Sequence, residues 1–139
     1  MRISELSRTA GVDVETIRYY EKAGLLPPPA RSANGYRDYS EAQVQRLAFI
    51  RQCRALDMTI KEIQCLLDIA GRPAAECSDV DRLVDEHLRR VRERIKSLRS
   101  LEQQLVVLRG RCGVPRTAAD CGILKELSAP RCKTSNSRQ

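Results

Sequence analysis

The sequence predicts a mainly α protein with a winged helix-turn-helix domain, one long helix and a short C-terminal helix. The chain has no Trp and a single Phe, so its core must be aliphatic, which is typical of helices. Its 139 residues, 42% of them hydrophobic, are enough for one such core. Residues 79–109 contain no Gly or Pro and keep a helical apolar pattern, which indicates one long helix.

Two short helices joined by a tight turn are predicted first. Ile3, Leu6 and Ala10 form one apolar face, which Gly11 ends. Asp13 is a good N-cap for a helix over residues 14–22. This second helix should pack Val14, Ile17 and Tyr20 inward and leave Glu15, Arg18, Tyr19 and Lys22 outside.

A small wing and two further helices follow. The prolines at 27–29 stop helical structure, and Asn34-Gly35 is a strong hairpin-turn signal before residues 36–39. Capping-box spacing predicts that helices begin after Ser40 and Thr59 and end near residues 56 and 69.

The long helix should begin at another capping box, formed by Ser78 and Asp81. Its apolar positions recur every seven residues, which predicts an antiparallel coiled-coil dimerisation helix. These seam positions are Val84, Val91, Leu98 and Leu105. The sequence thus divides into a helix-turn-helix domain (1–70), a linker (71–78), a dimerisation helix (79–110), a loop with a short helix over 123–128 (111–128) and a tail expected to be disordered (129–139).

Net charge alone does not locate a nucleic-acid site. The total is +7, but residues 1–70 hold ten Lys/Arg against nine Asp/Glu, whereas residues 71–139 hold fifteen against nine. No signal peptide or membrane span is evident, so we expect a cytoplasmic protein with no membrane partner. In that reducing compartment the six cysteines indicate packing, metal binding or redox chemistry rather than disulfides.

The positions of three cysteines predict a shared site. Cys77 precedes the long helix, and Cys112 and Cys121 follow it. A helix rises about 1.5 Å per residue, so Cys77 and Cys112 of one chain should lie roughly 50 Å apart. In an antiparallel dimer, however, Cys77 of one protomer would meet Cys112 and Cys121 of its partner, and would do so twice.

The strings VETIRYYEKAGLLPPPARSANGYRDY and RLAFIRQCRALDMTIKEI resemble the DNA-binding half of the MerR family of transcription regulators over about the first 70 residues. The resemblance implies a homodimer that binds double-stranded promoter DNA, works with RNA polymerase and is not an enzyme. It implies that a recognition helix and the wing contact the DNA and that Arg54 reaches a phosphate. The other residues that it implies as DNA contacts are Glu15, Thr16, Arg18, Tyr19, Arg31, Tyr36 and Arg37. Arginine is the best bidentate reader of guanine, which supports these roles.

The second half resembles the metal-sensing branch, most closely its lead-responsive members and less closely its cadmium-responsive ones. Three thiolates, from Cys77, Cys112 and Cys121, suit Pb(II), whereas Zn(II) prefers four tetrahedral ligands. Cd(II), Zn(II) or Hg(II) could also bind, with Asp120 or water completing a site. The alternative hypothesis is a redox sensor in which Cys112 and Cys121 form a disulfide.

The remaining candidate ligands are predicted to have smaller roles. Cys53 and Cys65 lie on expected helices at positions typical of buried packing residues. Cys132 lies near the end of the chain and could transiently capture metal. His87 is expected at a helix interface or on the surface. With one histidine, no phosphate-binding Gly loop and no CxxC, the chain does not have the signals of an enzyme.

Overall fold

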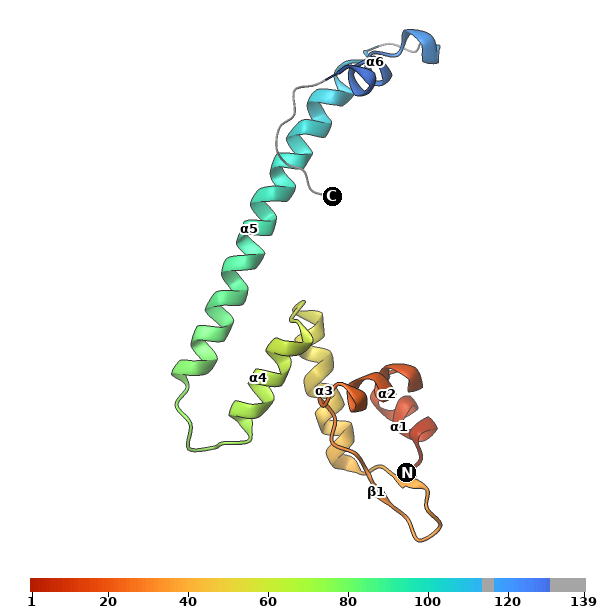
Figure 1. Cartoon of the computed structure of the whole chain (residues 1–139), viewed down its shortest axis with the longest axis vertical. Helices are drawn as coiled ribbons and strands as arrows, with labels where there is room; N and C mark the ends of the chain where they lie inside the picture. Colours follow the sequence, from red (N-terminus) through yellow and green to blue (C-terminus); the bar gives the residue numbers. More distant parts are fainter. Residues whose placement is uncertain (114–116, 131–139) are drawn as a thin grey trace. The chain divides into compact units, whose positions relative to one another are not determined.

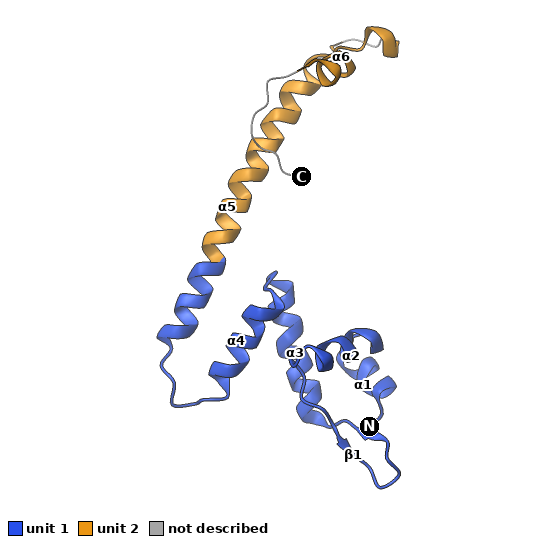
Figure 2. Cartoon of the chain, in the orientation of Figure 1, with its two compact units in different colours: residues 1–87 blue, residues 88–139 orange. Residues whose placement is uncertain are grey.

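A computed structural model describes residues 1–113 and 117–130 of the chain (Figure 1). The mainly helical fold that the sequence predicts is confirmed. The elements in order are α1 (Ile3–Ala10), α2 (Val14–Lys22), β1 (Ala30–Arg31), β2 (Arg37–Asp38), α3 (Glu41–Ala55), α4 (Ile60–Ala70), α5 (Ser78–Arg109), the 3₁₀ turn η1 (Ala118–Asp120) and α6 (Gly122–Ser128). They form two compact units, Met1–His87 and Leu88–Gln139 (Figure 2).

The first unit contains the hydrophobic core. Helix α1 packs against both α2 and α3, and α4 contributes Ile63 to the same cluster. Leu6, Ile17, Leu47 and Ile63 are completely buried, which fixes the helix-turn-helix on a base of aliphatic side chains. The amide of Gln64 on α4 donates to the carbonyl of Ala23 at 2.8 Å, and so ties α4 to the end of α2.

The turn between α1 and α2 forms at the predicted residues. Gly11 adopts a left-handed conformation with φ 70°, which a glycine tolerates without steric cost. Asp13 occupies the N-cap position of α2, as predicted. Its side chain makes no capping hydrogen bond, however, so only the position of the cap is confirmed.

Two of the three predicted capping boxes are present, those at Ser40 and Thr59. The backbone N–H of Ser40 donates to the Gln43 side chain at 2.8 Å, and that of Thr59 donates to the Glu62 carboxylate at 2.8 Å. Each box satisfies donors that the first turn of a helix would otherwise leave unpaired. The starts of α3 and α4 are therefore fixed by local sequence.

The wing is a two-stranded antiparallel hairpin. Ala30 pairs with Asp38 and Arg31 with Arg37, and Gly35 makes the turn with φ 83°. Residues 30–38 are all exposed, whereas Tyr39 is 2% exposed and anchors the base of the hairpin in the core. The wing therefore has no core of its own.

Helix α5 begins one residue earlier than predicted. Ser78 is already helical, and the N–H of Asp81 donates to the carbonyl of Cys77 at 2.9 Å, so the expected capping box is wrong: Cys77 takes the capping position. No residue of α5 is buried. Its seam leucines Leu98 and Leu105 are 56% and 63% exposed, which leaves an apolar face that no described residue of the chain covers. No described helix is long and apolar enough to cross a membrane.

The prediction for Cys53 is confirmed: it is buried, and this burial raises the pKa of its thiol. Two other details, the exposure of Cys65 and the turn η1, depart from the expectations. Cys65 is exposed, which contradicts the expectation that it packs in the core, because it lies on the solvent side of α4 opposite Ile63. The 3₁₀ turn η1 was not predicted. Cys132 and most of the expected tail lie outside the described residues.

We predict that Leu47→Ala lowers the free energy of unfolding by about 2–5 kcal/mol, because a completely buried leucine leaves a cavity when truncated. Leu56→Ala is the matched control, since Leu56 follows the same helix but is 62% exposed. Its effect should stay below about 1 kcal/mol. Urea unfolding followed by circular dichroism measures both, and equal losses would contradict this placement of the core.

Candidate nucleic-acid interface and metal centre

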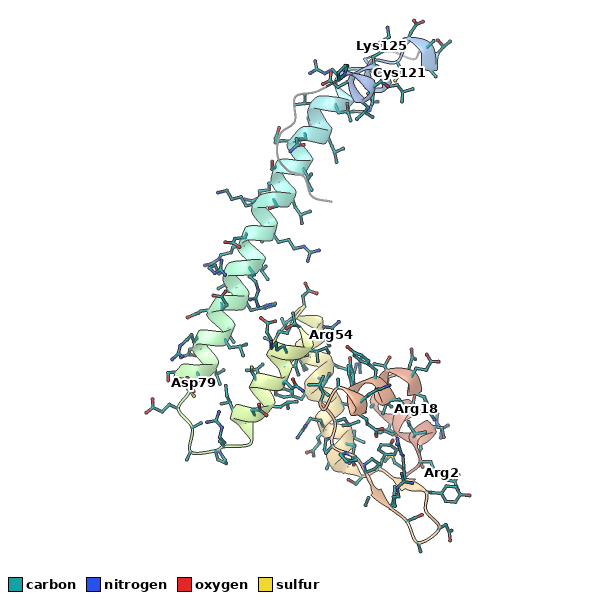
Figure 3. All side chains as sticks on the ribbon, in the orientation of Figure 1. Arg2, Arg18, Arg54, Asp79, Cys121 and Lys125 are labelled. Carbon is teal, nitrogen blue, oxygen red and sulfur yellow. The ribbon has the colours of Figure 1, made fainter. Side chains whose placement is uncertain are left out.

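A basic hollow lies between α2 and the wing. It encloses about 810 Å³ and has one acidic residue, Glu21, in its lining. Its basic lining residues are Arg2, Arg18, Lys22, Arg31 and Arg37. Five cations around one carboxylate make this concave surface suited to a polyanion. Figure 3 labels Arg18 on α2 and Arg2 just before α1.

The hollow gathers four of the residues that the sequence predicts as DNA contacts. Arg18 comes from α2, and Arg31, Tyr36 and Arg37 come from the wing. Tyr36 is 51% exposed, so its hydroxyl is accessible to a phosphate oxygen.

The other predicted contacts lie elsewhere on the same unit. Tyr19 and Glu15 are exposed on α2. Thr16 and Arg54 line a second, smaller hollow between α2 and α3, of about 430 Å³. The guanidinium of Arg54 donates to the carbonyl of Met58 at 2.8 Å, which orders the side chain at the end of α3.

Glu21 joins the wing to α2. Its Oε1 accepts from Arg37 Nη1 at 2.7 Å, and its Oε2 accepts from the Tyr39 hydroxyl at 2.7 Å. Burial, followed by the hydrogen bond to Glu21, raises the pKa of Tyr39, so its hydroxyl remains a donor at neutral pH. Both carboxylate oxygens thereby fix the base of the wing against the recognition helix.

Sequence reasoning missed two of these residues. Glu21 lies four positions after the buried Ile17 and therefore on the inward face of α2, where a charged residue indicates a fixed ion pair. Arg2 places its guanidinium 3.9 Å from the centre of the Tyr36 ring, a cation–π contact that holds the wing tip beside the start of α1. No local sequence signal indicates that second contact.

Two of the three predicted metal ligands lie together in the second unit. Cys112 follows α5, Cys121 occupies the N-cap position of α6, and their side chains are hydrogen-bonded. The backbone N–H of Leu124 lowers the pKa of Cys121, and the N–H of Ile123 and the Cys112 thiol act in the same direction. Two adjacent thiols, one with a lowered pKa, form a donor pair that fits a soft metal ion.

The third predicted ligand belongs to the other unit. Cys77 is exposed at the start of α5. Among the described residues of one chain, no group of three or more His, Cys, Asp and Glu side chains could hold a metal ion. Asp120 lies on η1, next to Cys121, where its carboxylate accepts from Thr117 at 3.5 Å. The structure thus pairs Cys112 with Cys121 in the second unit, whereas Cys77 belongs to the first.

His87 lies at a helix interface, as expected. Its Nε2 is 2.8 Å from the carbonyl oxygen of Leu56, and its Nδ1 is 3.3 Å from Glu62 Oε1. These contacts join α5 to the end of α3 and to the first turn of α4 within the first unit. His87 therefore has a packing and hydrogen-bonding role, whereas the cysteines are the predicted metal ligands.

Two family models match most of the chain. Residues 1–69 match the family model of the MerR HTH family regulatory protein, and residues 44–108 match a second model described as MerR, DNA binding. Among solved structures, the chain resembles the transcription regulator PbrR691 from Ralstonia metallidurans CH34 in complex with lead(II). The two are 50% identical, with a TM-score of 0.85 over 92% of this chain and 99% of that one.

Two curated relatives are also similar to this chain over most of its length. An HTH-type transcriptional regulator, a ZntR homolog of Haemophilus influenzae, is 41% identical over 109 residues, 78% of this chain and 81% of the relative. The mercuric resistance operon regulatory protein of Bacillus cereus is 38% identical over 126 residues, 91% of this chain and 96% of the relative.

We predict that Cys121 of the folded apoprotein ionises at lower pH than the same thiol in the urea-unfolded chain. The backbone N–H of Leu124 stabilises the thiolate only in the fold, so the alkylation rate should reach its half-maximum at lower pH. The rate of iodoacetamide reaction, read at the Cys121 peptide by mass spectrometry from pH 5 to 10, measures both midpoints. A folded-state midpoint at or above the unfolded one would show that α6 does not stabilise the thiolate.

Proposed function

This chain belongs to the MerR family of metal-responsive transcriptional regulators, and we propose that it activates a promoter when a soft divalent ion binds Cys77, Cys112 and Cys121. Pb(II) is the proposed inducer in preference to Cd(II), Zn(II) or Hg(II). The pairing of Cys112 with Cys121 at the end of a long helix none of whose residues is buried is the observation that carries this proposal. The protein is a regulator and not an enzyme, and regulators of this family bind promoter DNA.

The basic hollow supports the DNA-binding half of the proposal. We assign Arg18 and Tyr19, with Glu15 and Thr16 on the same helix, to the major groove. Arg31, Tyr36 and Arg37 of the wing and Arg54 are assigned to the backbone. Because Arg37 is paired with Glu21, its first role is to orient the wing, and its remaining donors can face a phosphate. We further propose that the protein acts in the cytoplasm, where it would meet promoter DNA, with RNA polymerase as its second partner.

The exposed face of α5 supports a homodimer. A helix with leucines exposed by more than half along one face has to bury them against another surface, and a second copy in antiparallel orientation offers the same face. A continuous helix of 32 residues separates Cys77 from Cys112. The dimer would therefore complete each site with one cysteine from one protomer and two from the other.

The donor set supports Pb(II). Three thiolates suit a large, soft ion that does not require a fourth ligand, and the similar PbrR691 structure contains lead(II). When bound, the ion would join Cys112 and Cys121 of one protomer to Cys77 of the other. The thiols must lose their protons for this, and the lowered pKa of Cys121 reduces that cost.

Activation then depends on two dimer conformations. We infer that the two DNA-binding domains sit on a promoter whose spacer is too long, and that the ion-bound dimer holds them in an orientation that bends and untwists the DNA for polymerase. The effect of the ion on the DNA is limited by the difference between its affinities for the two dimer conformations. A high affinity for both conformations alike would have no effect.

The hydrogen-bonded pair also favours a second candidate, a redox sensor in which Cys112 and Cys121 form a disulfide. A measurement of metal binding under strictly reducing conditions distinguishes the metal-responsive regulator from the redox sensor. A regulator that binds no metal with both thiols reduced would be the redox sensor.

We predict that Arg18→Ala weakens binding to the operator by about 1–3 kcal/mol more than binding to random DNA, because a base-reading arginine carries sequence discrimination. Fluorescence anisotropy at one salt concentration measures both affinities. Arg99→Ala, which removes an exposed arginine of α5, is the control and should alter neither. An equal loss on both DNAs would reassign Arg18 to phosphate contact.

The shared metal site predicts complementation between two inactive variants. Cys77→Ser and the double variant Cys112→Ser with Cys121→Ser each lack a complete site as homodimers. In the mixed heterodimer, one end recovers Cys77 from the double variant and the pair from the other chain, while the opposite end has no thiolate ligand. Titration followed by the thiolate charge-transfer band should show about one tight Pb(II) per heterodimer and none in either parent.

The heterodimer must be confirmed independently, for example by two affinity tags and mass spectrometry. If it forms and no tight site returns, the cross-protomer arrangement is wrong. Tight binding in the Cys77→Ser parent would likewise overturn it, since that variant keeps only the intrachain pair.

A further inference from the structure

Gly122 lies where the start of α6 passes the backbone that follows α5. A Cβ atom on Gly122 would collide with the carbonyl oxygen of Arg111 and would lie 3.0 Å from its carbonyl carbon. No side chain fits there unless the two segments move apart. Among the described glycines, those with positive φ are Gly11, Gly24 and Gly35. Space, and not backbone conformation, therefore requires glycine at position 122.

The same contact sets the position of both cysteines. Cys112 directly follows Arg111, and Cys121 directly precedes Gly122, so the two backbones that touch carry one cysteine each. The thiols meet in a hydrogen bond just beyond the contact. We propose that Gly122 is a positioning residue: its missing side chain allows one protomer to hold Cys112 and Cys121 as a preassembled pair of ligands for the soft metal ion.

Two side-chain contacts lie beside the backbone contact. Arg109 Nη1 donates to the carbonyl of Cys112 at 2.8 Å, and Arg111 Nε lies 3.7 Å from Glu126 Oε1. The Arg111 and Glu126 side chains are 50% and 34% exposed, and exposed ion pairs of this kind contribute little. The backbone approach at Gly122 is therefore the contact that a substitution can break.

A preassembled pair changes what the second protomer must supply. Two ligands that already face each other cost little further ordering when they bind, so only Cys77 of the partner subunit has to be added. This consequence rests on the proposed metal site. The positioning of the pair itself does not, and it can be tested without metal.

The first test measures how fast Cys112 and Cys121 close a disulfide. Diamide takes up two electrons and two protons from the two thiols, and the rate reports how often the sulfurs meet. In a Cys77→Ser background without metal, Gly122→Ala should close the disulfide at least about tenfold more slowly, because small misplacements of reacting groups carry such costs. Gly113→Ala is the matched control: it lies in the same loop, with nothing within 4 Å of an added Cβ, and should not change the rate.

The second test returns to the native cysteines. Gly122→Ala should bind Pb(II) at least about tenfold more weakly than Gly113→Ala in competition titrations, since the pair must first be brought together. Arg111→Ala, which removes the ion pair but keeps the backbone contact, should change the closure rate less than twofold. Circular dichroism should show that α5 is retained in all three variants.

The outcomes are separable. An unchanged closure rate in Gly122→Ala overturns the positioning role. A slower closure with undiminished Pb(II) affinity would instead overturn the assignment of this pair as metal ligands, and with it the metal half of the proposed function. A large effect of Arg111→Ala would move the positioning role from Gly122 to the ion pair.

Discussion

The unpaired apolar face of α5 is the constraint on which the rest of the molecule depends. An isolated helix is marginal in water, and most helical stability in proteins comes from packing of an apolar face. Helix α5 has 32 residues and none of them is buried. The first unit can fold around its own core, but α5 has to find its core on another surface. In the proposed function, dimerisation first buries this apolar face and only then serves as a device for sensing.

The first unit solves a different problem, which is how to hold a wing that has no core. Two pairs of facing residues cannot form a stable hairpin by themselves. Glu21 and Tyr39 supply what is missing, because one carboxylate fixes the wing to α2 and one buried ring fixes it to the core. A charged side chain on the inward face of a helix is thus used as a structural joint.

Local chemistry explains how much of this could be predicted from the sequence. The capping boxes at Ser40 and Thr59 and the turn at Gly35 act within a few residues, so their signals are complete in the sequence. The capping box expected at Ser78 does not form because the helix already begins at Ser78, which leaves Cys77 at the capping position, and such ends are decided by small differences.

Contacts between distant segments could not be predicted, because signals in the sequence act only over a few residues. The ion pair of Glu21 with Arg37 and the cation–π contact of Arg2 with Tyr36 join residues whose proximity depends on the whole fold. The exposure of Cys65 depends on which side of α4 faces the core, and its small apolar side chain suits either side. The three cysteines could be proposed as a set because a long helix imposes a simple distance.

The joint at Glu21 also has an evolutionary consequence. Because the wing and α2 are held to each other by contacts inside the first unit, the surface that would read DNA does not depend on residues of the second unit. Under the proposed function, the residues around Cys112 and Cys121 can therefore change under selection for a different ion while the operator stays the same. Conversely, a new operator can be acquired without loss of the inducer. A single ancestral chain of this design can give rise to many sensors by changing one end at a time.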